Sequence, residues 1–124
     1  MFLEHLTRCT GIDHRNGLTV AFAVTNLGTE PVQLLSATLL TPGSALRLTK
    51  VRIGGGRCAG GAPDQPVRLV SAARVVVAMS FGLGPDCPRK TGVQARVAFR
   101  AGGRLLHADS SELADLSRLT FAQC

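Results

Sequence analysis

The four cysteines, Cys9, Cys58, Cys87 and Cys124, are the residues whose type and spacing could most directly do chemistry. They lie 49, 29 and 37 residues apart, whereas a structural zinc site usually takes two ligands from one short C-x₂₋₄-C segment. A catalytic thiol at Cys87 is disfavoured because the neighbouring charge of Asp86 opposes formation of the thiolate. The spacing therefore favours two long-range disulfides, with reduced buried cysteines as the alternative. Four cysteines allow three connectivities.

The other residue types that could catalyse a reaction lack the required spacing. His5, His14 and His107 lie in separate segments, with no H-x-H or H-E-x-x-H pattern. The glycines at 54–56 are not followed by Lys-Ser/Thr, so they do not form a phosphate-binding loop. The serines at 110–111 fit the start of a helix and belong to no G-x-S-x-G motif. We therefore expect no enzyme activity, no metal and no cofactor.

Length and composition predict one globular domain, residues 1–124, because 45% of the residues are hydrophobic and 18% are charged. No window approaches the ~18 apolar residues of a transmembrane segment. The first residues, Met1 to His5, show no basic segment followed by an apolar stretch, so no signal peptide is expected within this chain. A removed signal, a domain of a longer anchored protein and a cytosolic protein are the open alternatives.

The charge balance favours anionic partners. Net charge is +6, which attracts membrane headgroups, anionic envelope polymers, nucleic acid or an acidic protein. The chain has no Tyr or Trp for base stacking, no dense Lys/Arg run and no motif of a known nucleic-acid reader. The sequence thus argues against nucleic acid.

Alternation of apolar and polar or small residues predicts that these candidate groups are carried by β-strands. Turn residues rich in Gly and Pro separate the apolar segments. The pattern is typical of an antiparallel sandwich or barrel with seven or eight short strands. The expected strands are 18–25, 32–40, 46–53, 74–81, 93–100 and 104–108, and the remaining one or two come from the candidate segments 2–10, 67–69 and 119–121.

Three local signals refine this expectation. A change of apolar phase predicts a β-bulge near Leu34 to Ser36. Gly102-Gly103 predicts a two-residue hairpin, in which both central residues adopt positive φ. Asp109 followed three residues later by Glu112 fits a capping box and predicts a short helical turn over residues 110–116.

Two stretches resemble bacterial immunoglobulin-like modules. Leu18 to Val32 contains the pattern V-x-N-x-G-x-x-P-V, which resembles the turn between their B and C strands, and Arg74 to Phe81 resembles their E strand. The segment at Asp86-Cys87 resembles exported actinobacterial domains that carry a cysteine after that strand. The resemblance implies an all-β, antiparallel immunoglobulin-like β-sandwich. Such modules serve as spacers, binding domains or enzyme appendages, so the fold does not select a function.

Antibody features are missing, because the chain has no Trp or Tyr and neither the expected B strand nor the expected F strand contains Cys. The cysteine positions instead suggest the pairs Cys58–Cys87 and Cys9–Cys124. The first pair would join two Gly/Pro-rich loops. The second would join the first and last strands, which are neighbours in immunoglobulin-like sandwiches.

The same arrangement would place strands 18–25 and 74–81 side by side. Their outward residues would form a flat, small, uncharged face that could dock a partner protein or a second copy of the chain. The alternatives are cover by the 110–116 helix or a plain β surface. The residues of this face are Thr19, Ala21, Ala23, Thr25, Val76, Ala78 and Ser80.

A second candidate surface is basic. Arg96 and Arg100 share the outward parity of their strand, and Arg104 is expected beside them across the hairpin. This stripe could bind an anionic partner, or it could be a solvated edge. The sequence as a whole favours a non-catalytic, extracytoplasmic accessory or protein-interaction module with two disulfides. The alternative is a binder of an anionic ligand or envelope polymer through this stripe.

Overall fold

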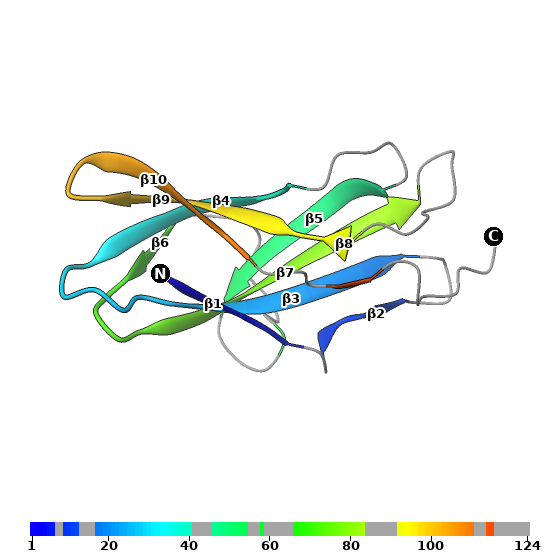
Figure 1. Ribbon diagram of the computed structural model, residues 1–124, viewed down its shortest axis with the longest axis horizontal. Helices are drawn as coiled ribbons and strands as arrows, with labels where there is room; N and C mark the ends of the chain where they lie inside the picture. Colours follow the sequence, from blue (N-terminus) through cyan, green and yellow to red (C-terminus); the bar gives the residue numbers. More distant parts are fainter. Residues whose placement is uncertain are drawn as a thin grey trace.

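Inward-facing apolar residues bring the strands together as two antiparallel sheets that pack face to face as a β-sandwich (Figure 1). The computed structural model describes residues 1–6, 9–12, 17–40, 46–54, 58, 66–83, 92–110 and 114–115. Within those ranges there is no α-helix, and no helix long and apolar enough to cross a membrane.

The first sheet has the strand order β1-β3-β7-β5. Its bounds are β1 Phe2–His5, β3 Leu18–Thr25, β7 Arg74–Leu83 and β5 Leu46–Gly54. A short strand, β2 (Gly11–Ile12), pairs with β3 beyond the end of β1. The expected pairing of strand 18–25 with strand 74–81 is confirmed, with Ala21 opposite Ala78.

The second sheet has the order β10-β9-β4-β6. Its bounds are β10 Arg104–Asp109, β9 Ala95–Ala101, β4 Val32–Leu39 and β6 Val67–Leu69. A separate pair of short strands consists of β8 (Gly92–Val93) and β11 (Ala114–Asp115).

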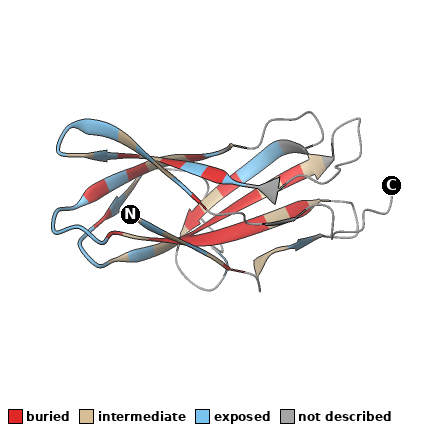
Figure 2. Ribbon diagram, viewed as in Figure 1, coloured by how far each residue is buried: buried red, intermediate tan, exposed pale blue. Residues whose placement is uncertain are grey.

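The core lies between the two sheets and is formed by inward-facing residues of both, and Figure 2 shows where buried residues lie along the strands. β3 and β7 differ from the other strands because their outward residues Ala21, Ala23, Val76 and Ala78 are buried as well as their inward residues. The largest fully buried side chains are Phe22, Phe81, Leu18, Leu34, Ile53, Leu69, Met79, Val20, Val24, Val76 and Val77.

Two predicted irregularities are confirmed. The β4–β9 register shifts between Leu34 and Ser36, where the phase change indicated a bulge. Gly102 and Gly103 have φ of 57° and 78°, as the two-residue hairpin between β9 and β10 requires.

The turn between β3 and β4 is fixed by a buried amide. The Asn26 side chain donates to the carbonyl oxygens of Glu30 (2.8 Å) and Leu69 (3.0 Å). Its own side-chain oxygen accepts from the Gly28 N–H at 2.9 Å. Asn26 therefore joins this turn to β6, which belongs to the other sheet.

The predicted helical turn over 110–116 is wrong, because Ala114–Asp115 form β11 and pair with β8. Ser110 continues the β10–β9 pairing, since its N–H donates to the Ala95 carbonyl and its hydroxyl accepts from the Ala95 N–H at 2.9 Å. A hydroxyl suited to a helix cap thus completes a sheet instead. The expected strand 119–121 lies outside the described residues.

Candidate functional site

The cysteines are paired differently from the prediction. Cys9 and Cys58 form a disulfide with their Cα atoms 5.5 Å apart, so both predicted pairs, Cys58–Cys87 and Cys9–Cys124, are wrong. The composition of the loops does not predict this pairing. The pairing depends on the strand order of the first sheet, which contains both β5, the strand before Cys58, and β3, with which β2, the strand after Cys9, is paired. Cys87 and Cys124 lie outside the described residues.

The predicted docking face of the first sheet is covered by the chain itself. Ala21, Ala23, Val76 and Ala78 are each no more than 7% exposed. Leu6 packs on them as part of a second apolar cluster, and Cys9 packs against that cluster. The expected open face is therefore wrong, as is its expected cover by a helix. Thr19 lies at its margin, with its hydroxyl 3.4 Å from that of Ser80.

Residues 6, 9 and 10, here named the covering segment, are held down by hydrogen bonds as well as by the disulfide. The Leu6 N–H donates to the Ala21 carbonyl at 3.0 Å, and the Thr10 hydroxyl donates to the Leu6 carbonyl at 3.1 Å. The His5 Nε2 lies 3.1 Å from the Thr10 hydroxyl. Partial burial lowers the pKa of His5 below its ordinary value of 6.5. This corner of the sheet is thus a packed structural element.

The predicted basic stripe is only partly assembled. Arg96 and Arg100 both point outward from β9 and are exposed. Arg104 instead lies opposite Ala101, which has the inward parity of β9, so it does not share their row. The Gly102-Gly103 signal correctly predicted the hairpin. It did not predict that the hairpin register places Arg104 outside the row of Arg96 and Arg100.

The positive charge of Arg96 is already compensated by a carboxylate of the same chain. It lies opposite Asp109, and its Nε and Nη2 donate to the two carboxylate oxygens at 2.8 and 3.3 Å. These hydrogen bonds lower the pKa of Asp109. Because the pair is satisfied within the chain, Arg96 has little remaining capacity for an external anion.

Arg68 on β6 supplies the cation that the sequence reasoning missed. Gln33 on β4 lies opposite Arg100 on one side and opposite Arg68 on the other. The three residues therefore form a row across the outer face of the second sheet, here named the Arg68–Gln33–Arg100 row. Among the described residues, neither arginine of the row forms an ion pair. In the sequence, Arg68 stands between apolar Val67 and Leu69, which is the pattern of an outward-facing residue. A strand of three residues is too short for this pattern to predict which face of the sheet Arg68 occupies.

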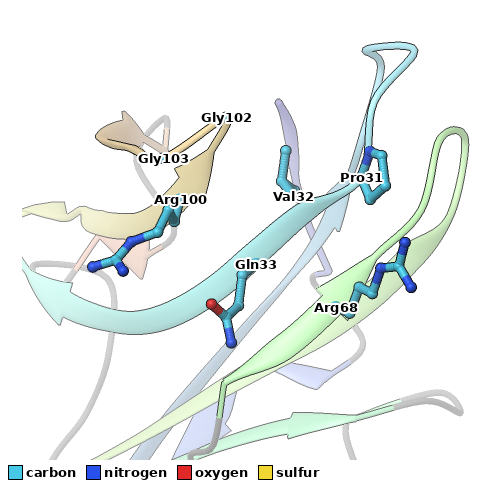
Figure 3. A pocket seen from close by; sticks show the side chains of 7 residues that line it. All are labelled: Pro31, Val32, Gln33, Arg68, Arg100, Gly102 and Gly103. Atoms are coloured by element: carbon cyan, nitrogen blue, oxygen red, sulfur yellow. The ribbon is translucent and has the colours of Figure 1, made fainter.

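An open cleft of about 290 Å³ accompanies this row. Figure 3 shows Arg100 and Arg68 extending to opposite sides of Gln33, with Pro31 and the Gly102–Gly103 turn bordering the same face. A Cβ placed on either glycine would meet no atom within 4 Å, so the turn leaves space at that border. The arrangement can donate several charge-assisted hydrogen bonds to anionic oxygens.

No family model matches this chain, and no curated protein matches it. Among the described residues, no group of three or more His, Cys, Asp or Glu side chains could hold a metal ion.

Proposed function

We propose that this chain is a non-catalytic, immunoglobulin-like accessory module that acts outside the cytoplasm and binds its partner through the outer face of the second sheet. The observation that carries the proposal is the difference between the two outer faces. On the first sheet, the outward residues in the middle of β3 and β7 are buried beneath Leu6, with Cys9 packed against them. The second keeps the Arg68–Gln33–Arg100 row and its cleft exposed.

The strand order supports the immunoglobulin-like assignment. When β1, β3, β4, β5, β7, β9 and β10 are lettered A to G, the sheets have the orders A-B-E-D and G-F-C. This is the order of constant-type immunoglobulin domains, to which β6 adds a short strand beside C.

The disulfide supports a location outside the cytoplasm, because such bonds form and persist in oxidising compartments. Structural roles for candidate catalytic side chains support a non-catalytic module. Cys9 is disulfide-bonded, Asp109 is paired with Arg96, and Ser110 completes the β10–β9 pairing.

Photo-crosslinking in the native host tests the binding face. A crosslinker replaces Thr38, which is exposed on β4 of the second sheet, or Thr49, which is exposed on β5 of the first. We expect adducts from position 38 and none from position 49. Equal adducts at both positions, or adducts from position 49 alone, contradict the proposed face.

Mass spectrometry of the non-reduced native protein tests the compartment. We expect a peptide in which Cys9 is linked to Cys58. Reduced Cys9 and Cys58 in freshly isolated, alkylated protein would contradict an oxidising location.

A further inference from the structure

Charge compensation distinguishes the arginines on the outer face of the second sheet. Three described arginines point from this face, and Arg96 is occupied by Asp109. Arg68 and Arg100 have no ion-pair partner among the described residues. Two forked guanidinium groups, each able to bind a carboxylate or phosphate through two N–H donors, are thus available to an external ligand.

Strand geometry sets the spacing of the two groups. Adjacent strands lie about 4.8 Å apart, so the backbones at Arg68 and Arg100, on either side of β4, are separated by about 10 Å. Figure 3 shows their side chains diverging from Gln33. One compact anion cannot contact both guanidinium groups in this arrangement, whereas two anionic groups joined by a chain can.

We propose that the Arg68–Gln33–Arg100 row binds an unbranched polyanion whose chain crosses β6, β4 and β9, with one anionic group at each arginine. Gln33 lies between them and offers an amide that donates and accepts hydrogen bonds to the linking part of the ligand. The inference rests on the proposed function, because it uses the same binding face, and it specifies the class of ligand.

The surroundings favour a polymer without bases. The described residues of this outer face include no Phe, Tyr or Trp, and the imidazole of His107 is the one aromatic ring among them, so nucleobases would gain little stacking there. Leu105 is 55% exposed and lies opposite Arg100, which places an apolar contact at one end of the row. The cleft beside Pro31 and the glycine turn gives room for the ligand chain.

The test compares linear polyphosphate with inorganic phosphate by isothermal titration at low ionic strength. Once one group binds, the second binds intramolecularly, so we expect the polymer to bind at least about 100-fold more tightly per chain. Arg68→Gln and Arg100→Gln should each weaken polymer binding at least about tenfold, because either variant leaves one anchoring arginine and loses most of the intramolecular gain. The double variant should bind more weakly than either single variant, because no arginine of the row remains.

Arg96→Gln and Arg104→Gln are matched controls, because each removes one positive charge outside the row. We expect each control to change polymer binding less than twofold, which separates the row from the general attraction of a protein with net charge +6. Polyglutamate, tested in parallel, distinguishes a carboxylate polymer from a phosphate polymer by which of the two binds more tightly. Thermal unfolding of every variant verifies that the exposed substitutions leave the fold intact.

Three results would overturn the inference. They are equal losses in the row and control variants, polymer binding no tighter than phosphate, and a double variant no weaker than either single one. Crosslinks from position 38 without polymer binding would reject the polyanion and leave the proposed function standing. Polymer binding without crosslinks from position 38 would contradict the proposed function and leave the polyanion site standing.

Discussion

The outer faces of the two sheets have similar strand geometry, but their central residues differ in exposure to solvent. On the first sheet, the small side chains of Ala21, Ala23 and Ala78 let the covering segment approach closely and exclude water. On the second, Arg68, Gln33 and Arg100 are long and polar, and they stay exposed. The small residues of the first sheet thus accommodate the protein's own chain, whereas the polar row of the second sheet is the surface proposed to bind a partner.

The largest expected effect comes from placing the same charge on both faces. Ala23→Glu buries an unpaired carboxylate and overfills a packed site, so we expect a loss of about 5 kcal/mol in the free energy of unfolding. Ala98→Glu, on the outer side of β9, should change it by less than about 0.5 kcal/mol. Urea denaturation measures both, and similar losses would remove the distinction between the faces.

The second-largest loss in the free energy of unfolding is expected from removal of the disulfide. Cys9→Ser removes a link across 49 residues, for which the chain-entropy model gives about 4 kcal/mol. Cys58→Ser should have the same effect, because either variant breaks the same bond. Chemical denaturation of oxidised protein provides the measurement. A variant as stable as the parent would mean that packing and hydrogen bonds hold the covering segment without help from the disulfide.

Substitution of Asn26 tests whether the end of β3 in the first sheet stabilises β6 in the second sheet. Asn26→Ala leaves the Glu30 and Leu69 carbonyls and the Gly28 N–H without their partner, so we expect a loss of about 2–3 kcal/mol. Because Leu69 follows Arg68 on β6, amide hydrogen exchange of β6 should rise more than that of β9. Uniform exchange across the second sheet would contradict this local role.

The smallest expected effect is a pH dependence at the covering segment. The folded-state pKa of His5 is lowered from 6.5, so the unfolded chain takes up its proton first. This group therefore has no effect on stability above about pH 7, and it destabilises the fold as the pH falls through 6.5. His5→Gln should remove that part of the pH dependence. Thermal unfolding between pH 5 and 8 measures it, and an unchanged profile would show that His5 does not contribute.

The strands were predictable because their signals are local. Alternation in 18–25 and 74–81 gave β3 exactly and β7 to within two residues of its end, and the glycines at 102 and 103 gave the hairpin. The phase change near Leu34 predicted the bulge. Each of these signals depends on neighbouring residues, whose side chains alternate in direction along a strand.

The site was harder to predict because it depends on pairing between distant segments. Arg68 joins Arg100 through Gln33 on β4, which lies 35 residues before Arg68 in sequence. The helix expected at 110–116 failed for the same reason, since pairing of Ala114 with Val93 outweighs a local capping signal. Cys9–Cys58 likewise depends on the order of strands within the sheet.

The disulfide also closes a covalent ring made of the chain from Cys9 to Cys58, which contains β2, β3, β4 and β5 and therefore passes through both layers. β3 and β5 are not neighbours, because β7 lies between them and outside the ring. In oxidative refolding, a chain that forms this bond first tethers the two flanking strands before the central one arrives. β7 then has to enter between two strands that the disulfide already links. Whether the thiols are oxidised before or after β7 docks thus sets the order in which this sheet is assembled.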